Sequence, residues 1–161
     1  MTLIGDMSEP ERRSWANLIV DITVFYFFIK AMVGKTGIEN IPSSGLVKIF
    51  IWLIVATIIL HVIIAAIFAI RLKSRGYESD ERDIEIERKG ARNGFWVLAI
   101  ALNIIIFMFL MQNTFPADYM PALGVSLLTP SHMFFALMAT LFLGDIVYRA
   151  TMVFNYQKTV Q

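Results

Sequence analysis

The chain contains no cysteine and carries little charge. Of its 161 residues, 17% are charged and 57% are hydrophobic, and the mean hydropathy is +0.65. The absence of cysteine excludes a disulfide-stabilised fold and a thiolate metal site. The high apolar content excludes an intrinsically disordered chain. A net charge of only +1 argues against nucleic acid as a partner, because nucleic-acid-binding domains carry a basic excess.

Long apolar runs are what the chain does contain. Four windows, at residues 15–33, 49–70, 95–111 and 133–153, are apolar nearly throughout. A helix needs about 20 such residues to cross the hydrocarbon core of a bilayer. The connections between the windows are too short for a water-soluble domain. We therefore predict one domain over residues 1–161, an all-α four-helix bundle that crosses the lipid bilayer as a multi-pass protein.

The basic residues predict the orientation of these spans. Most of the 14 lysines and arginines lie before the first window, in the connection at residues 71–94, or at the end of the fourth window and beyond it. Lysine and arginine in short loops favour the cytoplasmic side of a membrane. Both termini are therefore expected to face the cytoplasm. Short connections of this kind favour a protein of the prokaryotic inner membrane.

Residues 79–94, SDERDIEIERKGARNG, form the most highly charged segment. Ser79 suits a helix N-cap, and acidic residues followed by basic ones complement the helix dipole. The third helix is therefore expected to begin near Asp80 and to extend through the cytoplasm before it enters the bilayer near Phe95. The candidates for docking a protein partner on this helix are Asp80, Glu81, Arg82, Asp83, Glu85, Glu87, Arg88 and Lys89.

Two other interpretations of this segment stay open. Its charges could belong to a solvated helix that only sets the topology. Asp80, Asp83 and Glu87 share one helical face and could hold a divalent cation, but oxygen ligands for such ions usually come from a turning loop. We therefore predict no metal here. No cofactor is predicted either, because His61 and His132 lie about 15 Å apart along the bundle, too far to ligate one haem.

The run Asp80-Glu81-Arg82, with Ile86 and Lys89 after it, resembles a segment of a known family. That family consists of small, uncharacterised prokaryotic membrane proteins with an Asp-Glu-Arg run followed by Ile-x-x-Lys-Ala. Gly90 stands here where the family has alanine. The resemblance covers only this short segment. It implies a four-helix protein of a prokaryotic membrane and implies no activity.

Polar residues that interrupt the windows are candidates for function, because an ionisable group inside a bilayer is costly. At 1.5 Å of rise per residue, Asp21 and Asp145 lie about 10 Å from the cytoplasmic interface and His61 lies about 15 Å from it. Two layers at successive depths are therefore expected. The intramembrane polar candidates are Asn17, Asp21, His61, Asn103, Asp145 and Arg149.

Two hypotheses follow for these layers. Asp145 and Arg149 are spaced to pair within one helix, which leaves Asp21 without an obvious partner. Asn103 or Thr140 is expected to hydrogen-bond His61. Either these residues only make interhelical hydrogen bonds, or Asp21 and His61 form a path for protons or small ions. In the second case the Asp145–Arg149 pair would act as a gate.

Small residues mark the surfaces on which helices are expected to pack. Gly90 and Gly94 form a Gly-xxx-Gly pair, and Ala136, Thr140 and Gly144 recur every four residues. This spacing lets backbones approach closely in membrane bundles.

No catalytic motif can be assembled from the chain: it has no phosphate loop, no Glu-x-x-His pair and no Ser-His-Asp set. We therefore predict that it is not an enzyme. The first expectation is an accessory, scaffold or regulatory membrane protein that docks a cytoplasmic or membrane protein through residues 79–94. The alternative is a small transporter or ion pathway, which with four spans would need to form a homodimer.

Overall fold

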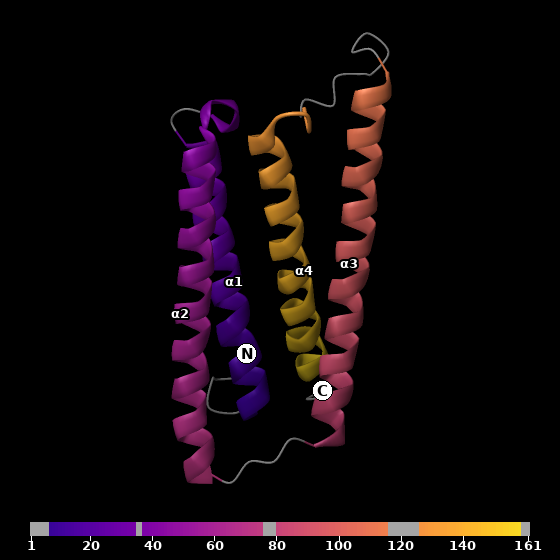
Figure 1. Cartoon of the computed structure of the whole chain (residues 1–161). Helices are drawn as coiled ribbons and strands as arrows, with labels where there is room; N and C mark the ends of the chain where they lie inside the picture. Colours follow the sequence, from indigo (N-terminus) through magenta and orange to yellow (C-terminus); the bar gives the residue numbers. More distant parts are fainter. Residues whose placement is uncertain (1–6, 35–36, 76–79, 116–125, 159–161) are drawn as a thin grey trace.

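Four long helices make up the computed structural model, which describes residues 7–34, 37–75, 80–115 and 126–158 and gives only the backbone at 71–75. They are α1 (Glu9–Val33), α2 (Ser43–Arg75), α3 (Glu81–Thr114) and α4 (Pro130–Lys158), and a short 3-10 helix, η1 (Ile38–Asn40), precedes α2. Figure 1 shows them running up and down in turn. Because these ranges contain no strand, the predicted all-α four-helix fold is confirmed.

All four helices are long and apolar enough to cross a membrane. Even the shortest, α1 with 25 residues, is about 38 Å long, which exceeds the hydrocarbon thickness of about 30 Å. Large apolar side chains on the outer faces, such as Ile58, Val62 and Phe107, are more than half exposed. Lipid would cover such surfaces, whereas water would not tolerate them over this area. The chain is thus a multi-pass membrane protein.

The charged segment and the third apolar window form one continuous helix, α3. Asp80 is its N-cap: its Oδ1 accepts a hydrogen bond from the Asp83 amide at 2.8 Å, and Asp83 Oδ2 accepts one from the Asp80 amide at 3.3 Å. This reciprocal capping box stabilises the first turn. The predicted start near Asp80 is confirmed. The predicted cap at Ser79, which lies outside the described residues, is wrong because the next residue performs that role.

Two helices occupy the middle of the bundle. α1 packs against α4, α2 packs on the other side of α1, and α3 packs on the other side of α4. α2 and α3 have at most marginal contact with each other. Figure 1 shows both chain ends at the same end of the bundle, which we call the terminal end. There α1 begins and α4 finishes.

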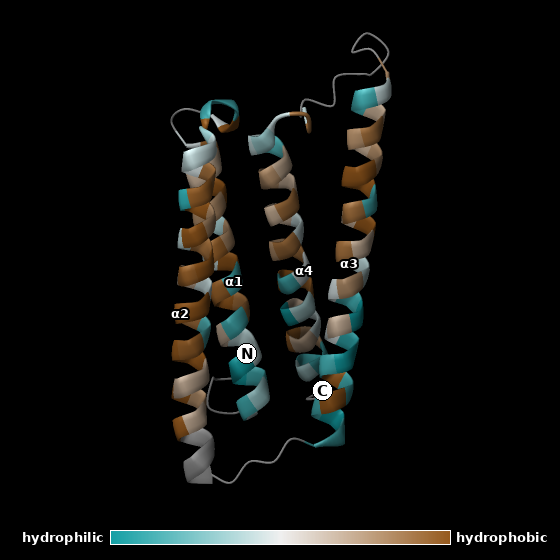
Figure 2. Cartoon of the chain, viewed as in Figure 1, coloured by the Kyte–Doolittle hydropathy of each residue, from teal (hydrophilic) through white to brown (hydrophobic). Residues whose placement is uncertain are grey.

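The buried face of α1 is polar near the terminal end and apolar beyond it. Residues three or four apart lie on one face of a helix, so a single stripe carries both characters. From Ser14 onward the buried residues are Ser14, Asn17, Leu18, Asp21, Val24, Phe28 and Met32, so that Leu18 is the one apolar member before Asp21. Figure 2 shows the same division, with hydrophilic residues gathered at the terminal ends of α1 and α3.

Aromatic rings fill the half of the interior away from the terminal end. Phe28 is fully buried, and its ring centroid lies 5.5 Å from that of Phe135 and 5.7 Å from that of Phe142. Phe25 adds a fourth ring at 5.5 Å from Phe142. Protein interiors packed in this way leave little space for water. These rings thus fill the space between α1 and α4 in this half of the bundle.

Glycines bring α3 and α4 close together. A Cβ added at Gly94 would lie 2.9 Å from the Gly144 carbonyl oxygen, and one added at Gly90 would lie 2.9 Å from the Tyr148 carbonyl oxygen. Gly144 in turn faces Leu98 of α3, where an added Cβ would lie 2.7 Å from Leu98 Cγ. Of the other small residues singled out from the sequence, Thr140 is buried and Ala136 is half-buried.

Replacing Gly94 with leucine is expected to lower the melting temperature of the detergent-solubilised protein by about 3 to 10 °C. The reason is that the new side chain would meet the Gly144 backbone, which cannot rotate away. The matched control is Ala91→Leu, which adds the same side chain at an exposed position of the same helix. Equal melting temperatures for the two variants would contradict the packing described here.

Candidate functional site

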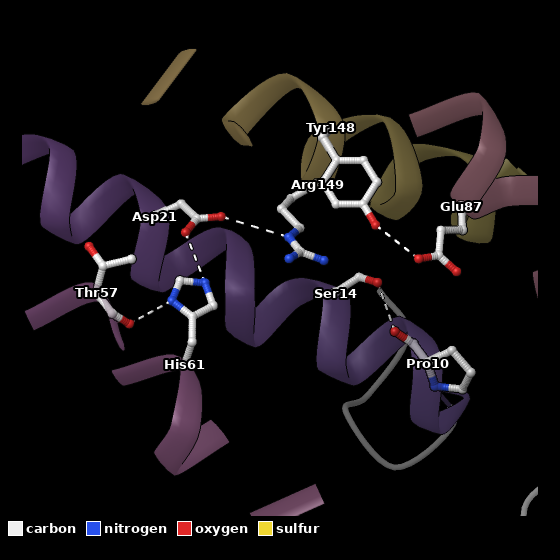
Figure 3. Close-up of polar contacts among 8 residues, drawn as sticks. All are labelled: Pro10, Ser14, Asp21, Thr57, His61, Glu87, Tyr148 and Arg149. Carbon is white, nitrogen blue, oxygen red and sulfur yellow. Dashed lines mark hydrogen bonds and ion pairs between the residues drawn. The ribbon is translucent and has the colours of Figure 1, made fainter. Parts of the chain in front are cut away.

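The buried carboxylate Asp21 of α1 meets an imidazole from α2. Its Oδ1 lies 3.2 Å from His61 Nε2, and its side chain is only 7% exposed (Figure 3). The sequence predicted these residues at successive depths, and that prediction is wrong. The depths were counted from the ends of the apolar windows, whereas α1 and α2 both extend farther toward the terminal end. Counted from the ends of the helices, the two residues are nearly level.

The other ring nitrogen of His61 determines where a proton must lie. Nδ1 is 2.9 Å from the Thr57 carbonyl oxygen, as Figure 3 shows. A carbonyl oxygen can only accept, so Nδ1 carries hydrogen in this arrangement. A hydrogen bond between Nε2 and Asp21 Oδ1 then requires a second proton. That proton makes the pair either an imidazolium with a carboxylate or a neutral imidazole with a carboxylic acid.

Arg149 of α4 completes the cluster. Its Nε lies 3.8 Å from Asp21 Oδ2, and both atoms are buried without a hydrogen bond. Its guanidinium also lies over the Tyr148 ring, 4.5 Å from the centroid. Asp145 is exposed and forms no ion pair with Arg149 among the described residues. The predicted pairing of Arg149 within α4 is therefore wrong, because the buried Asp21 attracts it instead.

The deeper layer expected from the sequence does not exist. Asn103 is exposed on α3, and its Nδ2 donates to the Ala99 carbonyl oxygen at 2.7 Å. It cannot approach His61, because α2 and α3 hardly touch. Thr140 is buried in α4, yet the partners of His61 are Asp21 and the Thr57 carbonyl. Asn17, also buried, lies one turn from Asp21 toward the terminal end.

A cavity of about 590 Å³ lies on the terminal side of this cluster. It receives side chains from all four helices, and His61 and Arg149 are at its deep end. Its volume is that of pockets that hold small organic ligands. The lining residues of acidic or basic type are Glu9, Arg13, His61, Asp83, Glu87 and Arg149.

The charged part of α3 has one face against α4. Tyr156 Oη donates to Asp83 Oδ1 at 2.9 Å, and Tyr148 Oη donates to Glu87 Oε1 at 3.3 Å. Ile86 is buried between them against Met152 and Tyr156. Lys89 instead pairs with Glu85 at 2.8 Å on the outer side. The docking candidates that stay exposed are Asp80, Glu81, Arg82, Glu85, Glu87 and Arg88.

Sequence reasoning missed the polar residues at the start of α1. Glu9 and Glu11 are buried, and Glu9 Oε1 accepts a hydrogen bond from Arg12 at 2.8 Å. Ser14 is buried as well, and its Oγ donates to the Pro10 carbonyl oxygen at 2.8 Å. The signal was the spacing of Ser14, Asn17 and Asp21, which continues the buried stripe of α1 beyond the apolar window.

Nothing in the comparisons with known proteins bears on this site. No protein-family model, curated protein or solved structure matches the chain. Within the described ranges, no group of three or more His, Asp or Glu side chains is placed to hold a metal ion. The function therefore has to be inferred from the cluster and its cavity.

Asp21→Asn and His61→Gln are each expected to lower the free energy of unfolding. The double variant should lose less than the sum of the two separate losses. A double-mutant cycle should give a coupling energy of about 0.5 to 2 kcal/mol, because both variants remove the same contact. The measurement is reversible unfolding in mixed micelles. A second cycle between His61→Gln and Asn103→Ala is the control, and a coupling as large as the first would contradict the geometry.

Proposed function

We propose that this protein is a small proton-coupled transport protein whose proton-binding site is the Asp21–His61 pair. The observation that carries this proposal is the pair of contacts made by the two ring nitrogens of His61. Nδ1 of His61 donates its hydrogen to the Thr57 carbonyl oxygen. A hydrogen bond between Nε2 and Asp21 therefore exists only while the pair holds one further proton, and it is lost when that proton leaves. His61 also lines the cavity, which gives that proton a route to water.

Arg149 makes release of this proton feasible. A carboxylate left alone in a buried site would cost several kcal/mol. Once the proton has gone, His61 is neutral and Asp21 is still balanced by Arg149 at 3.8 Å. Asp145, one helical turn before Arg149, offers a second carboxylate when the proton returns. The sequence predicted an Asp145–Arg149 gate. We propose instead that Asp21 and Asp145 compete for Arg149.

The two halves of the interior support access from one side only. The cavity reaches the cluster from the terminal end, while the rings around Phe28 fill the space between α1 and α4 in the other half. With the orientation favoured by the lysines and arginines, the terminal end faces the cytoplasm. This arrangement corresponds to an inward-facing state. Transport to the other side requires these rings to separate or a second copy of the chain to complete the path.

Proton flux into proteoliposomes is the direct test. With a potassium diffusion potential and a trapped pH-sensitive dye, wild-type vesicles are expected to change pH faster than empty ones. Asp21→Asn and His61→Gln should each remove most of this difference, because neither variant can hold the shared proton. Asn103→Ala, a polar change that faces away from the cavity, should keep it.

A second candidate function is docking of a cytoplasmic or membrane protein, as an accessory or regulatory subunit. It is favoured by one observation: Glu81, Arg82 and Arg88 are exposed on α3. Charges of both signs on one rigid helix suit an interface that selects its partner electrostatically. Wild-type vesicles that change pH no faster than empty vesicles would favour this function over transport.

The proposed orientation can be tested because the chain has no cysteine of its own. Ser44→Cys and Gln157→Cys place single thiols at exposed positions near opposite ends of the bundle. A membrane-impermeant maleimide should label the first in intact bacterial cells that express the protein. It should label the second only after the cells are permeabilised. The reverse pattern would place the cavity on the outer side.

A further inference from the structure

Arg149 has more hydrogen-bonding capacity than the protein uses. A guanidinium carries five N–H donors. None of those of Arg149 makes a hydrogen bond to a described residue, and its closest carboxylate atom is the one at 3.8 Å. Figure 3 shows Nε as the nitrogen nearest Asp21, with both Nη atoms beyond it. Because Arg149 lines the cavity, its Nη donors are available to an anion held there.

The cavity has the opposite charge on the side formed by α3. Glu87 and Asp83 line it there, and each accepts a hydrogen bond from a tyrosine hydroxyl of α4. The remaining charged lining residues outside the cluster are Arg13, which is exposed, and Glu9, which is paired with Arg12. The cavity therefore has the Arg149 guanidinium at its deep end and the carboxylates of Asp83 and Glu87 where α3 borders it.

Tyr148 contacts both of these charges. Arg149 lies over its ring, and Glu87 accepts a hydrogen bond from its hydroxyl group, as Figure 3 shows. The guanidinium and the carboxylate therefore lie at one tyrosine side chain.

We propose that the cavity binds a small zwitterion, with an oxyanion on Arg149 and an ammonium group on Glu87 a few bonds away. Planar guanidinium groups bind carboxylate and phosphate oxygens in pairs. This inference rests on the proposed function, since it names the class of solute that the same cavity would take. The zwitterion can be a free solute or a lipid head group, because the side between α2 and α3 is not closed by contacts.

The binding test uses purified full-length protein in detergent and three soluble probes: O-phosphoethanolamine, inorganic phosphate and ethanolamine. Isothermal titration should show saturable binding of O-phosphoethanolamine, at least about tenfold tighter than either half, because only the whole molecule satisfies both charges. Phosphate or ethanolamine binding as tightly as O-phosphoethanolamine would overturn the proposal. The proposal would also be overturned if none of the three probes bound.

Matched variants assign the binding to the two residues. Arg149→Gln and Glu87→Gln should each weaken binding by about 10- to 150-fold, the range for losing a charged hydrogen bond. Arg92→Gln and Glu85→Gln, made at exposed positions of α3 that do not line the cavity, should bind as the wild type does. Should Arg149→Gln fail to fold, Glu87→Gln decides the matter, because that exposed side chain is replaced by one of the same size.

Two lipids identify the source of the zwitterion. If short-chain phosphatidylethanolamine displaces O-phosphoethanolamine more strongly than phosphatidylglycerol does, the zwitterion is a lipid head group. Displacement by neither lipid would identify a free solute. Equal displacement by both would contradict recognition of the ammonium group.

Binding is measured without a gradient and proton flux without a probe, so the two proposals can fail separately. If the protein conducts protons but binds no probe, only the proposal of a bound zwitterion fails. If it binds the probe but conducts no protons, only the proposal of proton coupling fails.

Discussion

A carboxylate cannot stay charged inside a lipid bilayer without partners, and the arrangement of α1, α2 and α4 follows from that constraint. Asp21 is buried on α1, where the polar part of the buried face meets the apolar part. His61 of α2 and Arg149 of α4 are its partners. Without both partners, the buried carboxylate would be left alone at a cost of several kcal/mol. The contacts of Asp21 therefore favour one rotation of α2 and one of α4 about α1, which uniform apolar surfaces would not specify.

The sequence predicted what depends on long runs and missed what depends on single distances. The four spans, the extension of the third helix and its start near Asp80 all followed from hydropathy and charge, which act over many residues. The partners of Asp21 did not. Arg149 had a carboxylate at i−4 and another across the helix interface, and burial decided between them in a way that spacing cannot reveal. Depth was misjudged because hydropathy ends before the helices do, as the buried polar start of α1 illustrates.

The division of α1 into a polar and an aromatic half gives the bundle its sidedness. The buried residues are mostly polar up to Asp21, with Leu18 as the exception, and all apolar from Val24 onward. The same helix therefore lines the cavity and forms part of the aromatic half. A molecule in the cavity would meet the cluster before it meets the aromatic rings. The cluster and the aromatic half thus involve adjacent turns of one helix.

Tyr148 joins two parts of the structure that were described separately. Its backbone and ring pack on Gly90 and Gly94, its hydroxyl holds Glu87, and Arg149 lies over its ring. The glycines leave no side chain between α3 and this tyrosine, so Tyr148 packs directly on the α3 backbone. The close contact of α3 with α4 and the position of the guanidinium beside Asp21 therefore depend on the same side chain.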